Sequence, residues 1–365
     1  MNLIVNLVSN QTIPNLQFLK KLYKQDDHLL FINTDKMNEL GVVQWIITAF
    51  SSLGFSVEEL HNIIIDEYND EDIKTKLNSF DFDIYDRIFV NVTGGTKVMS
   101  LISYEFFKEK AAEIFYITGR DDELLKLFPS RNRSNLHLGV KINLEEYLSA
   151  YGFKTHCSSH SGKSLSYTME FFDNFLKIKD EPSQYHFIKT IQNTYRGKTC
   201  NIAEVPGLES FFKSINYVVK NGVQLTKVDT KYLSGDWFEE LIFHKIKSEL
   251  DLKDDEICTG LHLIKNEVNN EFDVVFILEN TLYVIECKTL IINKEFPSLV
   301  NDTFYKLSSL TNQLGLFCRK AVFTLNRSKD FKESHLNRAK ELNIKIIGLD
   351  EIQSALSNST LSELL

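Results

Sequence analysis

Long apolar runs and paired cysteine motifs are both absent from this chain of 365 residues. No stretch approaches the ~20 apolar residues that a membrane-spanning helix needs, and the opening Met1–Val5 is typical of a β-strand and not of a signal peptide. The five cysteines are odd in number and lack any CxxC spacing. Reduced thiols are the default for such a chain, so we expect a cytoplasmic protein without a membrane partner.

Positive charge is also scarce. Lysine and arginine total 41 against 50 aspartates and glutamates, which gives a net charge of -9. This balance excludes a general attraction to nucleic acid, so a protein of this charge that acts on nucleic acid needs a local basic patch, a bound metal or a partner ligand. With 43% hydrophobic and 25% charged residues, the composition is that of a globular protein, and 365 residues are enough for two domains.

Predicted strands and helices alternate along the first part of the chain, from residue 1 to about 140. The expected strands are 3–8, 29–32, 63–65, 88–92 and 114–117, and helices are expected near 16–22, over 38–53 and from about 70. Near-continuous apolar strands between helices are typical of a parallel sheet that is covered on both faces. We therefore predict an α/β fold with a Rossmann-like N-terminal domain.

Ligands of open α/β sheets bind beyond the carboxyl ends of the strands, and two of these ends are polar here. Ser9–Asn15 follows the first predicted strand, and Thr93–Ser100 connects the fourth to a helix. Glycine lets backbone N–H groups approach a ligand closely, and a helix N-terminus favours an anion. The spacing matches neither GxxxxGK nor GxGxxG, which disfavours ATPase and NAD-binding functions. The candidate ligand-binding residues are Ser9, Asn10, Gln11, Thr12, Thr93, Gly94, Gly95, Thr96 and Lys97.

A second candidate site lies at a predicted β-hairpin in the C-terminal part. Two short apolar runs, 274–278 and 282–285, flank a polar break. Because strand side chains alternate between faces, Asp273 and Glu286 can converge where the strands end, with Lys288 beside them. Two carboxylates at one point need a cation between them, and hard oxygen ligands suit Mg²⁺ or Mn²⁺. A lysine there can orient water or offset charge on a phosphate.

Further candidates flank the hairpin. Upstream, Gly235–Leu241 opens a predicted amphipathic helix that carries Glu239 and Glu240. These two residues cannot both face the site, because adjacent helical residues point ~100° apart. Glu271 is another candidate because it shares a strand face with Asp273. Cys287 points away from Glu286, so its side chain is expected to be buried while its backbone carbonyl can reach a metal.

Asp273, followed on the next strand by Glu286-Cys287-Lys288, resembles the PD-(D/E)xK core of restriction-endonuclease-like enzymes, with Phe272 in the place of the usual proline. In that superfamily an upstream helix carries an additional acidic ligand. Here the resemblance implies Glu239 in this role, because it directly follows the aromatic pair Trp237-Phe238, and Glu240 and Glu271 remain alternatives. The resemblance thus implies Glu239, Asp273, Glu286 and Lys288 as catalytic residues. It implies a metal held by Asp273, Glu286 and Cys287.

The N-terminal loops, above all Val92–Lys97, resemble those of a CARF domain, the sensor of CRISPR-associated proteins for cyclic oligoadenylates. A CARF domain before a PD-(D/E)xK domain is the layout of CRISPR ancillary nucleases. The resemblance implies a homodimer that binds a cyclic oligoadenylate, most often cyclic tetra-adenylate in the family. It further implies nicking of DNA, or cleavage of single-stranded or locally opened DNA or RNA, in type III CRISPR antiviral defence. The resemblance leaves three points open: whether the substrate is DNA or RNA, the ring size of the activator, and whether the sensor degrades its own ligand.

We expect a CARF domain over 1–140, a connecting region over 141–230 and a restriction-endonuclease-like α/β/α domain over 231–365. Two alternatives remain. A nucleotide-sensing transcription regulator would use its nuclease-like half only to bind DNA, but such a module has no need of Asp273, Glu286 and Lys288 together. A restriction-type nuclease with a purely structural Rossmann half would cleave without a cyclic nucleotide.

Overall fold

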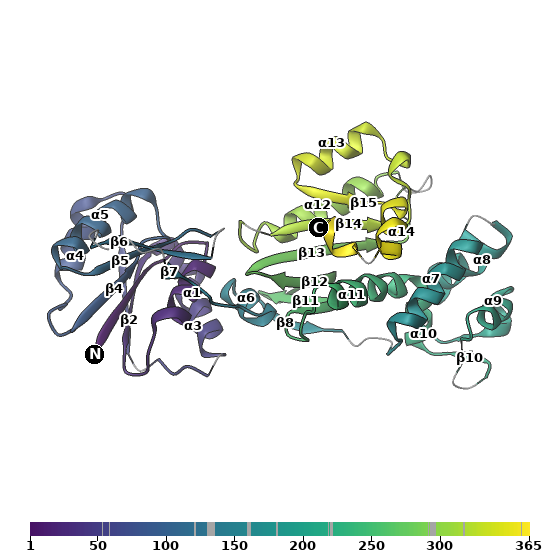
Figure 1. The fold of residues 1–365 in the computed structure, drawn as a ribbon, viewed down its shortest axis with the longest axis horizontal. Coiled ribbons are helices and arrows are strands. Elements are labelled where there is room, and N and C mark those ends of the chain that lie inside the picture. The colour runs from purple at the N-terminus through teal and green to yellow at the C-terminus, as the bar shows by residue number, and fades with distance from the viewer. Residues whose placement is uncertain are drawn as a thin grey trace. The chain divides into compact units, whose positions relative to one another are not determined.

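The computed structural model describes the chain apart from residues 53, 58, 120–121, 130–135, 159–161, 180–181, 218, 220–221, 291, 293–296, 317 and 359 (Figure 1). It consists of two compact units. The first contains residues 1–155, 264–268 and 312–317, and the second contains 156–263, 269–311 and 318–365. No helix among the described residues is long and apolar enough to cross a membrane.

The first unit is built on a sheet with the strand order β3-β2-β1-β4-β5-β6-β7. Its strands are β1 (Asn2–Leu7), β2 (His28–Thr34), β3 (Leu60–Ile65), β4 (Arg87–Asn91), β5 (Glu113–Ile117), β6 (Glu123–Phe128) and β7 (Leu136–His137). Strands β1 to β5 are parallel, which confirms the predicted Rossmann-like domain. Strands β6 and β7 extend it in antiparallel fashion and were not predicted.

Helices cover both faces of this sheet (Figure 1). They are α1 (Ile13–Leu22), α2 (Asp35–Leu40), α3 (Val42–Ser51), α4 (Asp70–Asn78), α5 (Lys97–Glu109) and α6 (Leu144–Ala150). Buried side chains of α4 and α5 pack on one face, and α1, α3 and α6 contact one another. The single helix predicted over 38–53 is divided between α2 and α3 because Gly41 adopts a left-handed conformation with φ 76°, and residue 53 lies outside the described part of the chain.

The second unit contains a sheet with the strand order β15-β14-β13-β12-β11-β8. These strands are β8 (Lys154–Cys157), β11 (Ile257–Lys265), β12 (Val268–Leu278), β13 (Thr281–Lys288), β14 (Arg319–Thr324) and β15 (Ile344–Ile347). A separate pair is formed by β9 (Cys200–Asn201) and β10 (Gln224–Leu225). The helices are α7 (Leu165–Lys179), α8 (Pro182–Thr190), α9 (Leu208–Ser214), α10 (Lys227–Lys231), α11 (Trp237–Glu249), α12 (Leu299–Thr311), α13 (Glu333–Glu341) and α14 (Leu349–Asn358).

The predicted connecting region, 141–230, differs from the compact units of the structure. Its first part belongs to the first unit, in which α6 contacts α3. From His156 onward it belongs to the second unit, because aromatic residues of α7 pack around Trp237 of α11: the Phe171 and Phe175 rings lie 5.0 and 4.9 Å from the indole. The core of the second unit therefore extends well before the predicted boundary at residue 231.

Candidate active site

The predicted hairpin is formed by β12 and β13. The register pairs Leu278 with Thr281, which leaves Glu279 and Asn280 as a two-residue turn. Both turn residues have positive φ, the conformation that a type I′ hairpin turn requires. The pairing continues to Val274 opposite Ile285. The next residues on each strand are Asp273 and Glu286, so the turn determines that these two carboxylates lie at the same end of the hairpin.

Beyond the Val274–Ile285 pair, three oxygen atoms converge on a single cation, the ammonium of Lys288. Its Nζ lies 2.6 Å from Glu286 Oε1 and 3.1 Å from Asp273 Oδ2, and it donates to the Cys287 carbonyl at 3.3 Å. Asp273 Oδ2 also accepts a hydrogen bond of 2.7 Å from the Cys287 backbone N–H, which fixes the carboxylate against β13. The structure thus brings together Asp273, Glu286, the Cys287 carbonyl and Lys288.

The electrostatics of this cluster favour a cation. Burial, followed by the negative charge of Asp273, raises the pKa of Glu286. Burial would lower the pKa of Lys288, but Asp273 and Glu286 outweigh it and raise that pKa. Two carboxylates and one carbonyl are hard oxygen donors, so the set fits Mg²⁺ or Mn²⁺. Burial raises the pKa of the Cys287 thiol well above its usual range. The backbone carbonyl is the group of Cys287 that contacts the Lys288 ammonium together with the two carboxylates.

Helix α11 places Glu239, and not Glu240, next to the hairpin. Burial, then the charges of Asp273 and Asp236, raise the pKa of Glu239 well above its ordinary value. Glu240 is buried elsewhere, where its charge adds to burial in raising the pKa of Tyr232. Glu271, the other alternative, is exposed.

Three charged residues near this cluster were not predicted. Asp236 lies one helical turn before Glu239, and burial raises its pKa although the positive charges of Arg196 and Lys231 oppose the shift. Arg196 pairs with Asp236 at 3.0 Å, and Lys306 of α12 lies 3.8 Å from Glu286 Oε1. The three-residue spacing from Asp236 to Glu239 was a usable signal, because such residues share a helix face. No comparable signal in the sequence marks Arg196 and Lys306, because only the folding of the chain brings these residues to the cluster.

We predict that Glu239→Gln stabilises the metal-free protein at neutral and alkaline pH. A carboxyl group whose folded-state pKa is raised contributes stability below its unfolded value, 4.5, and loses it as pH rises through the folded value. The substitution removes the cost of ionising Glu239, and each kcal/mol gained corresponds to about 2–4 °C in Tm. Thermal unfolding in chelator from pH 4 to 9 measures the difference.

The same substitution is expected to weaken Mn²⁺ binding, so the ranking of the two proteins should reverse when metal is added. Glu341→Gln, at an exposed acid that ends α13, is the matched control and should show neither effect. An unchanged or lower Tm for metal-free Glu239→Gln at pH 8 would contradict the placement of Glu239 in this cluster.

A disulfide corrects the expectation that all cysteines are reduced. Cys157 of β8 is bonded to Cys258 of β11, while Cys200, Cys287 and Cys318 are free. The two partners are 101 residues apart in sequence, and only the neighbouring positions of β8 and β11 in the sheet reveal the pairing. The structure joins cysteines that lack any sequence motif.

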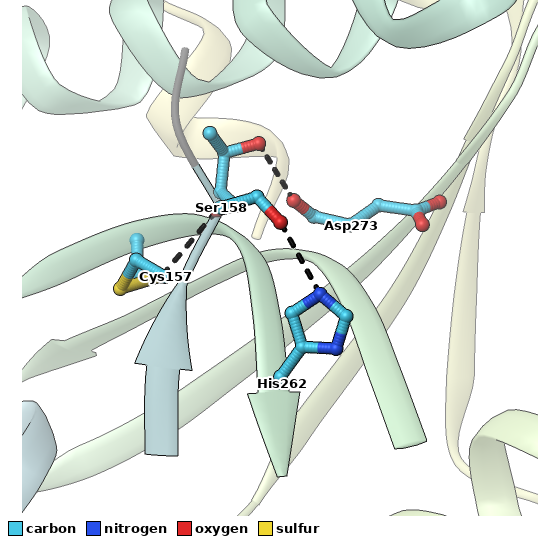
Figure 2. Close-up of a disulfide and its surroundings, with 6 residues drawn as sticks. Cys157, Ser158, His262 and Asp273 are labelled. Atoms are coloured by element: carbon cyan, nitrogen blue, oxygen red, sulfur yellow. Dashed lines mark hydrogen bonds between the residues drawn. A yellow bond between two sulfur atoms is a disulfide. The ribbon is translucent and has the colours of Figure 1, made fainter. Parts of the chain in front are cut away.

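The disulfide lies close to the strand that carries Asp273 (Figure 2). Next to Cys157, Ser158 donates its backbone N–H to the Gly260 carbonyl, and its hydroxyl lies 3.2 Å from His262 Nε2. Thr259 Oγ1, beside Cys258, donates to the backbone carbonyl of Asp273 at 2.9 Å. Strand β11 thus holds the backbone of Asp273 from the side opposite β13.

Buried asparagines organise the other candidate site, at the carboxyl ends of β1 and β4. Asn6 and Asn91 are register partners, and Asn91 Nδ2 donates to Asn6 Oδ1 at 3.1 Å. Asn15 of α1 donates to the same oxygen and to the Leu7 carbonyl. Asn91 Oδ1 accepts from the Thr93 backbone N–H. These side chains hold the two polar loops and were missed; polar residues at the ends of apolar strands were the available signal.

The predicted ligand-binding residues divide into two groups. Thr93 and Thr96 are used within the fold: Thr93 Oγ1 accepts from the Ile117 N–H, and Thr96 Oγ1 caps α5. Thr12 is buried, and Gln11 Oε1 accepts from the Leu316 N–H. In contrast, Asn10 and Lys97 are exposed and Ser9 is half-buried. Asn10, Lys97 and Ser9 are therefore the side chains of this set that are best placed to meet a ligand.

The glycines allow close contacts within the sensor loops. A Cβ on Gly94 would lie 2.2 Å from the Leu7 carbonyl oxygen and 3.5 Å from Ser9 Oγ. At Gly95, φ is +77° and a Cβ would lie 3.1 Å from the end of the Met99 side chain. Gly94 thus allows the loop after β4 to touch the end of β1, which explains how residues ~90 apart form one surface.

A Rossmann-like unit with polar loops at its strand ends is joined to a unit in which two carboxylates and a backbone carbonyl converge on the Lys288 ammonium. This combination is that of a sensor coupled to a nuclease. Family models agree: residues 3–147 match the Card1 CARF domain, and residues 226–360 match the Card1-like endonuclease domain. The chain therefore belongs to the CRISPR ancillary nucleases that join a CARF domain to an endonuclease domain. No curated protein matches the sequence.

Solved structures share this fold over all or most of the chain. Can2 from Sulfobacillus thermosulfidooxidans, solved with cyclic tetra-adenylate, has 20% identity and a TM-score of 0.75, with 100% of both chains covered. Protein VC1899 from Vibrio cholerae has 18% identity and a TM-score of 0.76, with 100% of this chain and 97% of that chain covered. A type III CRISPR defence DNA nuclease activated by cyclic oligoadenylate has 16% identity and a TM-score of 0.54, over 89% of this chain and 45% of that one.

Proposed function

We propose that this protein is a metal-dependent endonuclease of type III CRISPR antiviral defence that a cyclic oligoadenylate activates. The convergence of Asp273, Glu286 and the Cys287 carbonyl on one cation is the observation that carries the nuclease assignment. The cyclic tetra-adenylate bound to Can2 supports the same activator here. Substrates are DNA, RNA or both, single-stranded or locally opened, and the protein acts in the cytoplasm.

Each residue of the cluster has a role in phosphodiester hydrolysis. Asp273, Glu286 and the Cys287 carbonyl would hold Mg²⁺ or Mn²⁺, and Glu239 would assist from α11. A bound divalent ion supplies charge stabilisation and lowers the pKa of water. Lys288, held by both carboxylates, would orient the attacking water and offset charge on the phosphate. Arg196 and Lys306 add the local positive charge that an acidic protein needs to hold a phosphate backbone.

The activator would bind between two copies of the CARF domain. A cyclic oligonucleotide with an even number of identical nucleotides has twofold symmetry, so it matches a homodimer whose two sensor loops face one axis. Binding would shift the dimer towards the arrangement in which the nuclease sites accept substrate. Ser9, Asn10 and Lys97 provide the accessible polar groups on each copy.

Cleavage of labelled DNA and RNA with Mn²⁺, with and without a panel of cyclic oligoadenylates, tests this function. We expect cleavage only with metal and the matching ring, and none in excess chelator. Equal cleavage without any cyclic nucleotide would indicate a plain nuclease whose Rossmann half is structural. Nucleic-acid binding without cleavage under all conditions would favour a transcription regulator.

We predict that Lys97→Ala weakens cyclic oligoadenylate binding by roughly 10- to 100-fold. The lysine begins α5 next to the loop after β4, and it is exposed. A hydrogen bond to a charged group is worth about 1.5–3 kcal/mol, and its loss has this effect on Kd. Calorimetric titration gives the value. Lys108→Ala, in the last turn of the same helix, is the control, and equal affinities of both variants would contradict a ligand at Lys97.

A further inference from the structure

Two histidines and a glutamate meet at the start of β2 and β3, in the sensor domain. His28 begins β2, and Glu59 and His61 lie at the start of β3. His28 Nε2 lies 3.4 Å from Glu59 Oε2, and His61 Nε2 lies 3.1 Å from Glu59 Oε1. One ligand atom from each residue lies within 4.8 Å of the others. The parallel register sets His61 opposite Leu30, which brings the two strand starts together.

The donor types select a particular class of ion. Two imidazole nitrogens and one carboxylate form a mixed set that suits zinc and related transition metals, whereas Mg²⁺ prefers oxygen only. In a tetrahedral site with bonds of about 2.1 Å, neighbouring ligand atoms lie roughly 3.4 Å apart. Both histidine–carboxylate distances are already close to this value. The side chains of His28, His61 and Glu59 are 15%, 28% and 53% exposed, so water can reach a fourth position.

A surrounding shell holds the rings in place. Tyr85 Oη lies 3.1 Å from His28 Nδ1, the ring nitrogen that faces away from Glu59. It also lies 3.4 Å from His61 Nε2, a contact that a metal bound to this nitrogen would replace. When His28 binds metal through Nε2, its proton resides on Nδ1 and is donated to Tyr85, the kind of contact that orients metal-binding histidines. The Phe80 ring meets the His61 ring edge-on at 5.0 Å, and the Tyr85 ring meets His28 in the same way at 5.5 Å.

From this geometry we propose that His28, Glu59 and His61 form a zinc site in the sensor domain. The site lies where β2 begins, whereas the ligand loops follow the carboxyl ends of β1 and β4. It shares no residue with the sensor loops or with the cluster around Asp273. Zinc here would cross-link the starts of β2 and β3 and so stabilise the edge of the CARF sheet.

Titration of metal-free, full-length protein with Zn²⁺, in competition with a chromogenic chelator and in excess Mg²⁺, tests the site. Excess Mg²⁺ competes for the oxygen donors around Asp273, and the histidine variants then show whether the zinc that still binds is held by His28 and His61. We expect one zinc per chain and an affinity that falls ~100-fold or more in His28→Gln and in His61→Gln, with a fall of about 10-fold in Tyr85→Phe. His137→Gln, at an exposed histidine of β7, should bind zinc like the wild type.

Cobalt substitution gives a second readout that does not depend on the variants. Co²⁺ in a four-coordinate nitrogen and oxygen site absorbs strongly in the visible range, and we expect this band in the wild type with excess Mg²⁺ present. Circular dichroism establishes whether each histidine variant is folded. Equal zinc affinity in folded His61→Gln and wild type, or loss of all zinc on adding Mg²⁺, would overturn the proposal and leave Glu59 as a carboxylate that the two imidazoles share.

Discussion

Asp273→Asn and Glu286→Gln should each lower the cleavage rate by ~100-fold or more, while cyclic oligoadenylate binding and the fold stay intact. Both carboxylates contact the same cation position, and removing one leaves too few hard oxygen donors for a divalent ion. The fold should tolerate the changes, because each removes one negative charge from a buried acidic cluster. Single-turnover cleavage, at a Mn²⁺ concentration that saturates the wild type and with saturating activator, measures the rates.

Glu279→Gln, at the exposed turn of the same hairpin, is the matched control and should cleave at the wild-type rate. Raising Mn²⁺ should restore part of the activity if the loss is one of metal affinity, and none if the group acts only in the transition state. Cleavage at the wild-type rate in Glu286→Gln would contradict the site.

The hairpin was predictable because its information is local. Two β-branched runs and a polar break give the strands, and the two-residue period of a strand gives the faces of Asp273 and Glu286. One detail was not local: Asp273 is held by the Cys287 N–H on β13 and, through its carbonyl, by Thr259 on β11. The sequence also left Glu239 and Glu240 as alternatives, which the packing of α11 decides.

The parts that were missed depend on contacts between distant segments. Cys157 and Cys258 have no shared motif, and β8 is a short strand at the sheet edge. Arg196 lies 40 residues before Asp236, to which it is bound. The 141–230 region was difficult for a similar reason, because its aromatic residues complete the core around Trp237 instead of forming a domain.

The two sensor loops were predicted to lie at carboxyl ends of strands, where ligands of open α/β sheets bind. The strand order that sets β1 beside β4, and so brings these loops together, was not predicted. The structure adds a role for their glycines within the fold, and their part in ligand binding stays a prediction. Both glycines serve contacts within the fold, Gly94 with Leu7 and Gly95 with Met99. A glycine-rich sequence predicts that the backbone comes close to another group, but it does not identify that group.

Nucleic acid and activator should tighten each other's binding, and this linkage should be the largest effect in the protein. In a two-state dimer, an activator that works by population shift binds the active state better, and so must the substrate. Moving such a dimer from mostly inactive to mostly active requires about 10⁴-fold differential affinity. A chain of net charge -9 has little general attraction for nucleic acid, so its inactive state is easily maintained.

Glu286→Gln protein permits the measurement, because it should hold nucleic acid without cleaving it and retains the Lys288 ammonium next to the phosphate. Activator affinity is measured by titration with and without saturating nucleic acid, and heparin at equal ionic strength controls for general polyanion effects. Thermodynamic reciprocity requires that nucleic acid tighten activator binding by the same factor as activator tightens nucleic acid. Equal activator affinities in a protein whose wild type cleaves only with activator would mean that activation changes the catalytic step and not access of the substrate.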